Sequence, residues 1–276
     1  MEKIQQLLSK VEVLPPSPTL LPKLLPALSD VDNNFDEVVE IIALDPALTA
    51  KLLQICNSAF FGMENPVTSV SEAVSQVGYQ SVYLLVAMIS GSGCFPCPAP
   101  AGVDPGRLWR HSITSAFNAK FVAESAGEDD NLLFTAGLLH DIGKVVLGQI
   151  EPLKMVSYMY VPFNATVAVH EQLLFGCTHA EVGATLLENW KLPEPIIAAV
   201  RWHHDPGAAP SFKSIAACVA LGNLLTHSAD HSAVTEQDDF KAGLDLLQLS
   251  PQLIGRWREK LRGQQDLIDS LSKLPV

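Results

Sequence analysis

Apolar residues recur at helical spacing along most of the chain. In residues 35–57, FDEVVEIIALDPALTAKLLQICN, they return every three or four positions, which is the period of an amphipathic α-helix. Asp45-Pro46 interrupts this run, and proline suits the first turn of a helix, so we expect two helices joined there. No stretch alternates clearly between apolar and polar residues, and no hairpin turn signal stands out. The pattern predicts an all-α fold.

Further helices are expected on both sides of one compositional break. Glycine, proline and cysteine crowd residues 91–106, GSGCFPCPAPAGVDPG, which is typical of a linker or a long surface loop. We therefore expect an amino-terminal lobe (1–98), a linker (99–106) and a second lobe (107–276). The expected helices cover 18–29, 69–91 (one or two helices), 107–126, 131–147, 151–158, 165–174, 179–190, 194–204, 212–227 and, as a carboxy-terminal pair, 237–273. The mixed charge of the last segment favours packing on the body of the protein over membrane binding.

Composition narrows the class of protein. The 276 residues are 48% hydrophobic, enough for a sizeable core. The formal net charge is −12 with only 18 Lys and Arg, so we expect no direct nucleic-acid partner, since such binding needs a basic face. The start of the chain lacks a signal-peptide pattern, and its most apolar stretch, Val82–Ile89, is too short to cross a bilayer. These features predict a cytoplasmic protein that does not contact a membrane.

Cysteine usage does not indicate a disulfide framework or a zinc site. The five cysteines are an odd number, and a cytosolic chain seldom carries disulfides. Cys94 and Cys97 form a CxxC pair, but no strand precedes it as in redox motifs, and no second pair follows as in zinc motifs. We interpret both cysteines as incidental to the linker.

The candidate chemistry centres on LLFTAGLLHDIGKVVL. His140 and Asp141 follow an apolar helical run, where an unpaired buried carboxylate would be costly. A metal ion compensates that cost, and imidazole with carboxylate suits iron, zinc or manganese. Lys144 lies one turn further on, and Gly143 is expected to end or loosen the helix and to let a ligand approach. Alone, the pair is also compatible with a hydrogen-bonded surface couple.

Other histidines strengthen the metal interpretation, although each has a structural alternative. His111 lies near the start of an amphipathic helix, His179 follows the capping residue Thr178, and His203 and His204 end an apolar helix. The last position is one that cations favour at helix carboxyl termini. We interpret the remaining histidines as surface or structural residues: His170, His227 and His231.

The series His111, His140-Asp141, His179 and His203-His204 resembles the HD metal-dependent phosphohydrolase superfamily, in particular its HD-GYP branch. The amino-terminal motifs LPPSPTLLPKLL, DPALTAKLL…NSAFFG and VTSVSEAVSQVGYQSVYLLV resemble the HDOD (HD-related output domain) family more closely, over residues 11–230. That resemblance implies an amino-terminal helical bundle packed on a divergent HD-type helical core. It also implies a bacterial regulatory role, with signalling proteins or a phosphate-containing small molecule as partners.

Two departures from the HD pattern weaken the expectation of catalysis. The last metal-binding aspartate of HD enzymes aligns with Asn223, a neutral and poor ligand, and no Gly-Tyr-Pro triad follows His204. Three hypotheses stay open. The first is a signalling module with a retained metal site. The second is a phosphohydrolase with a two-metal centre held by the predicted ligands, in which Asp141 bridges the two ions and Lys144 steadies the phosphate charge. The third is a purely structural histidine cluster.

Overall fold

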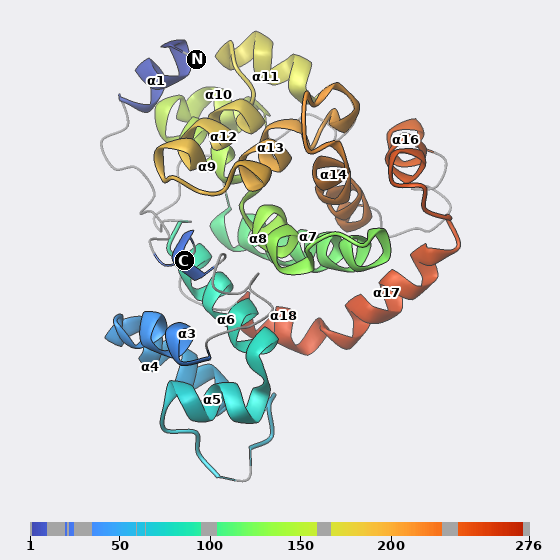
Figure 1. Ribbon diagram of the computed structural model, residues 1–276. Coiled ribbons are helices and arrows are strands. Elements are labelled where there is room, and N and C mark those ends of the chain that lie inside the picture. Colours follow the sequence, from blue (N-terminus) through green and yellow to red (C-terminus); the bar gives the residue numbers. More distant parts are fainter. Residues whose placement is uncertain are drawn as a thin grey trace.

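The computed structural model describes residues 2–9, 20, 22–24, 35–58, 60–63, 65–94, 104–158, 167–227 and 237–272. Every regular element in these ranges is a helix, which confirms the predicted all-α fold (Figure 1). Most of the helix expected over 18–29 lies outside the described residues, and so do residues 99–103 of the expected linker. Residues 105 and 106 of that linker belong instead to the next helix.

Four helices form the described part of the amino-terminal lobe. Asp45 lies between the first two of these helices. It caps the start of the second, because its Oδ1 accepts hydrogen bonds from the backbone N–H groups of Ala47 and Leu48, each at 3.0 Å. This is the division that the Asp45-Pro46 pair predicts. Gly78, at φ 85°, separates the third helix from the fourth. The four helices are α3 (Phe35–Ala43), α4 (Pro46–Cys56), α5 (Val70–Val77) and α6 (Tyr79–Ser92).

The second lobe is built around the long helix α7, against which α8 and α14 pack (Figure 1). Its elements are α7 (Pro105–Ala126), α8 (Asp130–Leu139), α9 (Ile142–Ile150), α10 (Pro152–Tyr158), α11 (Val167–Phe175), α12 (His179–Asn189), α13 (Glu194–Trp202), the 3-10 helix η1 (Pro206–Ala208) and α14 (Lys213–His227). The prediction of a single helix over 131–147 was wrong. The chain breaks between α8 and α9, ahead of Gly143, at His140 and Asp141.

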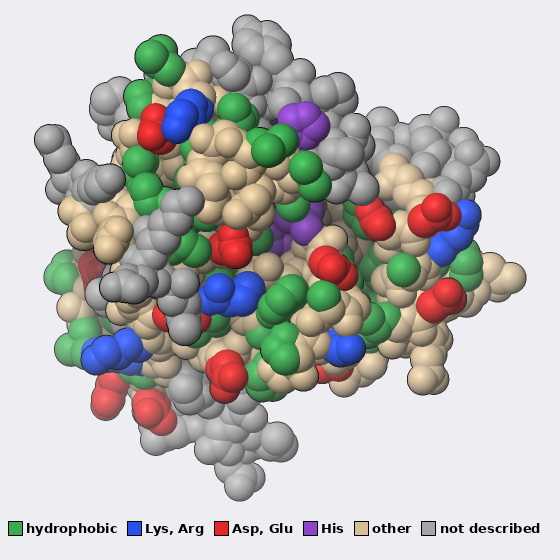
Figure 2. Space-filling view, turned by 90° about the horizontal axis from the view of Figure 1, so that it is seen from above, with side chains coloured by type: hydrophobic (Ala, Val, Ile, Leu, Met, Phe, Trp, Pro, Cys, Tyr) green, Lys and Arg blue, Asp and Glu red, His purple; other side chains and the backbone are tan. Residues whose placement is uncertain are grey.

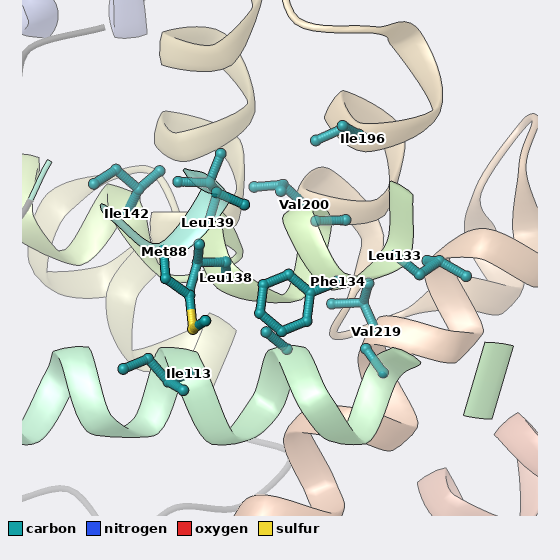
Figure 3. Packing of buried hydrophobic residues seen from close by; sticks show 14 of the residues in the cluster. Met88, Ile113, Leu133, Phe134, Leu138, Leu139, Ile142, Ile196, Val200 and Val219 are labelled. Atoms are coloured by element: carbon teal, nitrogen blue, oxygen red, sulfur yellow. The ribbon is translucent and has the colours of Figure 1, made fainter. Parts of the chain in front are cut away.

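The core of this lobe lies where α7, α8, α13 and α14 converge (Figure 3). Phe134 of α8 is fully buried and meets Phe117 of α7 edge to face, with ring centroids 5.2 Å apart. Gly222 brings the backbone of α14 onto α7, since a side-chain carbon there would lie 2.7 Å from the amide nitrogen of Ala119. Burial of these apolar faces stabilises the arrangement and holds the ends of α8 and α13 close together.

Polar contacts join the two lobes. Tyr83 of α6 donates a hydrogen bond to the carbonyl oxygen of Asn131 at 3.1 Å and contacts the hydroxyl of Thr135. Gln80 donates to Asp130 at 2.8 Å. The first helix, α1 (Glu2–Leu8), packs on α12 of the second lobe. Its residues were expected to belong to the amino-terminal lobe.

The described residues 237–272 form three helices, where a pair was expected: α16 (Asp238–Leu247), α17 (Leu253–Gly263) and α18 (Gln265–Leu271). α17 and α18 pack on α7, as expected for a segment that contacts the body of the protein. The indole of Trp257 donates to Ser125 Oγ at 2.9 Å, and that of Trp109 donates to the carbonyl oxygen of Leu271 at 3.1 Å. None of the described helices has the length and apolar character needed to cross a membrane.

Candidate metal centre

The break between α8 and α9 places a histidine and an aspartate inside the lobe. His140 is the C-cap residue of α8, and Asp141 is the N-cap residue of α9. Asp141 makes no side-chain capping bond to α9, although aspartate is a favoured cap. Both side chains are buried. The helix break therefore directs the carboxylate into the protein interior.

The structure brings the six predicted ligands together in two groups. His111, on α7, joins His140 and Asp141 in what we call the aspartate half. His179, the first residue of α12, joins His203 and His204 at the end of α13 in what we call the histidine half. Within each group the candidate ligand atoms lie within 4.8 Å of one another.

Asp141 lies between the two halves. Its Oδ2 is 3.5 Å from His111 Nε2 and 3.4 Å from His140 Nε2, while its Oδ1 is 3.2 Å from His179 Nε2. Oδ1 is buried and accepts no hydrogen bond from the residues that the structure describes. A carboxylate oriented in this way can bridge two cations.

Hydrogen bonds donated by Nδ1 set the tautomers of three histidine rings. His140 Nδ1 is 2.7 Å from the carbonyl oxygen of Gly137, and His203 Nδ1 is 2.7 Å from that of Val200. His179 Nδ1 is 2.6 Å from Glu171 Oε1. Because these oxygens only accept, Nδ1 of each ring carries a proton, and in the neutral form of the ring Nε2 presents a lone pair to the cluster.

The facing nitrogens have the spacing of shared ligands. Nε2 of His179 is 3.3 Å from Nε2 of His203 and 3.2 Å from Nε2 of His204, and Nε2 of His111 is 3.3 Å from Nε2 of His140. Two lone pairs at this distance repel unless an extra proton or a cation lies between them. Two imidazoles bound at about 2.0–2.1 Å to one tetrahedral ion have nitrogens roughly 3.3 Å apart. The donor set therefore fits a divalent metal ion.

Burial holds most of these imidazoles neutral. It lowers the pKa of His140 and lowers the pKa of His111, His203 and His204 well below the ordinary value. Burial also lowers the pKa of His179, but the Glu171 carboxylate outweighs it, so that this pKa is raised. Neutral imidazole is the form that binds metals.

Two carboxyl groups stay ionised inside the protein. Burial alone would raise the pKa of Asp141, but His140 and Lys144 outweigh it and hold the pKa well below its usual value. Burial would likewise raise the pKa of Glu171, but His179 outweighs it and lowers the pKa. A desolvated carboxylate of this kind is costly without a cation nearby.

Lys144 lies at the cluster, as expected, but it contacts the carboxylate rather than open space. Its Nζ is 2.7 Å from Asp141 Oδ2, and its side chain is 14% exposed. His111 and His204 are partly exposed, whereas the other four predicted ligands are buried. Figure 2 shows histidine surface recessed in a hollow on one face of the molecule. The centre is therefore buried on one side and reaches solvent at His111 and His204.

Two residues at the centre were not expected from the sequence. Glu171 of α11 is fully buried and binds His179 twice, through Nδ1 and through the backbone N–H at 2.9 Å. The sequence feature that could have identified Glu171 is a carboxylate within the apolar run VAVHEQLLF. His227, interpreted as surface or structural, is exposed, and its ring lies 4.5 Å from that of His111. No spacing in the sequence pointed to that contact.

The remaining candidates lie as follows. Asn223, at the position of the missing aspartate, is buried, and its Oδ1 has no hydrogen-bond partner among the described residues. His170 lies on α11, outside both groups, and His231 lies outside the described residues. Cys94 is buried, while Cys97 also lies outside the described residues.

Comparison with known proteins identifies relatives of this chain. Residues 14–206 match the family model of the HDOD domain. The chain is 27% identical over 233 residues to an uncharacterised protein of Treponema pallidum (strain Nichols), which corresponds to 83% of this chain and 45% of that protein. It is 30% identical over 110 residues to ribonuclease Y of Campylobacter jejuni, which corresponds to 40% of this chain and 16% of the enzyme. The chain thus spans less than half the length of these relatives.

Solved structures share the fold over nearly the whole chain. An HDOD domain protein of unknown function from Geobacter sulfurreducens is 24% identical with a TM-score of 0.78, covering 99% of this chain and 97% of the other. A Shewanella amazonensis SB2B protein, provisionally named a phosphohydrolase, is 23% identical with a TM-score of 0.72, covering 98% of both chains. A Marinobacter aquaeolei VT8 protein, provisionally named a signal transduction protein, is 23% identical with a TM-score of 0.75, covering 98% of this chain and 64% of the other.

Proposed function

This chain belongs to the HDOD domain family, and on that basis we propose that it is a regulatory module of signal transduction that holds a divalent metal ion. The observation that carries the metal proposal is the 3.3 Å separation between Nε2 of His179 and Nε2 of His203. Both rings carry their proton on Nδ1, so only an added proton or a metal ion reconciles the two facing lone pairs.

The donor set limits the choice of metal. Five imidazoles and one carboxylate suit iron, manganese or zinc, whereas magnesium and calcium prefer sites made of oxygen atoms. His140, His179 and His203 are held by hydrogen bonds behind the ring, an arrangement that increases the affinity of histidine for metals. The unpartnered Oδ1 of Asp141 supplies the negative charge.

The absence of one metal ligand favours a regulatory role over catalytic turnover. Asn223 replaces the aspartate that the HD pattern places there, so one ligand and one negative charge are missing. The regulatory proposal is further supported by the Marinobacter protein, whose provisional name is that of a signal transduction protein. We propose a signalling protein or a phosphate-containing small molecule as the partner that responds to the centre.

The second candidate is a metal-dependent phosphohydrolase. It is supported by the fit of the donor set, by the provisional name of the Shewanella protein and by the partial likeness to ribonuclease Y. A bound divalent ion would lower the pKa of a water molecule and polarise the phosphoryl oxygen. Lys144, at the edge of the cluster, would neutralise part of the phosphate charge. Asp141 and the histidines would bind and orient the ion.

Metal content of the purified protein tests the main proposal. Protein made without a polyhistidine tag is analysed by mass spectrometry beside a His140→Ala, Asp141→Ala variant. A His170→Ala variant is the control, because His170 lies outside both groups. We expect metal in the wild type and the control and little in the double variant, with circular dichroism confirming that each is folded. Equal metal content in all three proteins would contradict the proposal.

Activity assays separate the two candidates. The metal-loaded protein is incubated with bis(p-nitrophenyl) phosphate, cyclic dinucleotides and a short RNA, with manganese or iron(II). Product release above that of the double variant would favour the phosphohydrolase. Metal binding without such release would favour the regulatory module.

A further inference from the structure

We propose that the two halves of this centre are unequal and that one ion binds tightly in the histidine half, with Glu171 as the residue that positions its ligands. This inference rests on the proposed metal binding and adds the order of occupancy and the role of a residue outside the predicted ligand series. It follows from three differences between the halves.

The first difference is the completeness of the ligand set. The histidine half has three imidazoles, His179, His203 and His204, and Asp141 Oδ1 lies 3.2 Å from His179 Nε2. Four such ligands make a complete tetrahedral site. The aspartate half has two imidazoles and the same shared carboxylate, and Asn223 provides no charge where a fourth ligand is expected.

The second difference is the state of the two oxygens of Asp141. Oδ1, which lies next to the histidine half, accepts no hydrogen bond from the described residues. Oδ2, which lies next to the aspartate half, accepts one from Lys144 Nζ at 2.7 Å. An ion in the aspartate half must therefore compete with an ammonium group for its only carboxylate oxygen, and an ion in the histidine half need not.

The third difference is Glu171. Its Oε1 is 2.6 Å from His179 Nδ1, and its Oε2 accepts from the His179 backbone N–H at 2.9 Å. One carboxylate thus holds the ring and the main chain of the same ligand. In the aspartate half, His140 is held by a neutral carbonyl oxygen, that of Gly137. A carboxylate behind a histidine makes the ring a stronger donor and fixes its orientation.

Glu171 is a positioning residue, because it acts through His179. It is fully buried and comes from α11, a helix that supplies none of the predicted ligands. Its negative charge also offsets the positive charge of an ion in the histidine half at short range, where the low dielectric strengthens the attraction. We therefore expect the histidine half to bind its ion first.

Titration with Co²⁺ tests this order, because calorimetry gives the number and affinity of bound ions and the visible spectrum reports their coordination. The wild type should bind one ion tightly. Glu171→Gln keeps the shape of the side chain and removes its charge, and it should weaken this ion by about 10- to 100-fold. Glu171→Asp should restore part of the affinity. Glu188→Gln, which removes an exposed ion pair with Arg201, should change neither the stoichiometry nor the affinity.

A second variant keeps the test independent of any folding defect at Glu171. Asn223→Asp restores the carboxylate that the HD pattern has at this position, and it should add a second bound ion without weakening the first. Two equally tight ions in the wild type would overturn the inference, as would a Glu171→Gln variant with unchanged affinity. Absence of any bound ion in the wild type would instead defeat the proposed metal binding itself, so the two failures are distinguishable.

Discussion

A side-chain carbon added at Gly143 would lie 2.0 Å from the carbonyl oxygen of His179. It would also lie 2.8 Å from the amide nitrogen of Gly183, one turn further along α12. Helices α9 and α12 therefore touch through their backbones at the point where each contributes to the centre. The absence of a side chain at position 143 allows His179 to lie within 3.2 Å of Asp141.

Gly143→Ala should separate these two helices. The added methyl group meets backbone atoms, which cannot move aside as a flexible side chain would, so we expect a loss of about 3 kcal/mol or more in the free energy of unfolding. Gly255→Ala is the matched control, because its methyl group meets nothing within 4 Å. On an exposed helical position it should stabilise by about 0.5–1 kcal/mol. Urea unfolding of both variants in a chelator measures the difference, and equal stabilities would contradict the close approach.

Helical periodicity predicted most of the fold, because apolar spacing and proline positions act locally. The junction at Asp45-Pro46 is an example, since the capping bonds of Asp45 need only the next three residues. The break at His140 and Asp141 was missed because the apolar pattern of 131–147 continues through it. The break is favoured by contacts that are remote in the sequence, namely those of Asp141 with His111 and His179.

The ligand series could be predicted because its order along the chain is distinctive. Glu171 and His227 could not be, because neither has a spacing that marks it. Glu171 contacts His179 only because a turn after α11 returns the chain to the start of α12. His227 contacts His111 across two helices that are more than a hundred residues apart in sequence. Such pairs are set by tertiary packing, which a local pattern does not contain.

The capping residue Thr178 should link helix stability to metal binding. Its hydroxyl accepts from the Glu181 N–H, and Glu181 returns a bond to the Thr178 N–H at 2.8 Å, so both cap α12 just before His179. Thr178→Ala should cost about 1 kcal/mol of stability and lower metal affinity. Ser69→Ala removes the equivalent cap of α5, far from the centre. It should cost a similar amount and leave metal affinity unchanged.

Thermal unfolding and calorimetric metal titration of these two variants provide the measurement. Thr178→Ser retains the hydroxyl and should behave as the wild type in both assays. If Ser69→Ala lowered metal affinity as much as Thr178→Ala, the effect would be one of global stability, and the proposed link through His179 would be wrong.

The cysteines should be unreactive in the folded protein. Four of the five are buried: Cys56, Cys94, Cys177 and Cys218. Burial raises the pKa of Cys56 to about 11 and that of Cys94 to about 12, so little reactive thiolate forms at neutral pH. A thiol reagent such as Ellman's should therefore titrate at most one thiol, Cys97, in native protein and five in guanidinium chloride. Rapid reaction of two or more native thiols would argue against these environments.

Acid should destabilise the metal-free protein at a mildly acidic pH. Burial lowers the pKa of five imidazoles below the value of about 6.5 that they have in the unfolded chain: His111, His140, His203, His204 and His227. The unfolded state therefore binds more protons below that pH, and stability falls as the pH falls. His179 acts in the opposite sense, because its pKa is raised, but it is one group against five. The melting temperature in chelator should thus be highest near pH 7.5 and decrease steadily towards pH 5.5.

A variant tests whether the cluster causes this dependence. His203→Gln removes a buried imidazole whose pKa is lowered well below its ordinary value, so its melting temperature should vary less between pH 7.5 and 5.5 than that of the wild type. His170→Ala, outside both groups, should retain the full dependence. Asp141 and Glu171 do not alter this comparison, because their lowered pKa values lead to protonation only at a more acidic pH. A wild-type melting temperature that is constant or rises towards pH 5.5 would show that the imidazoles are not held neutral by burial.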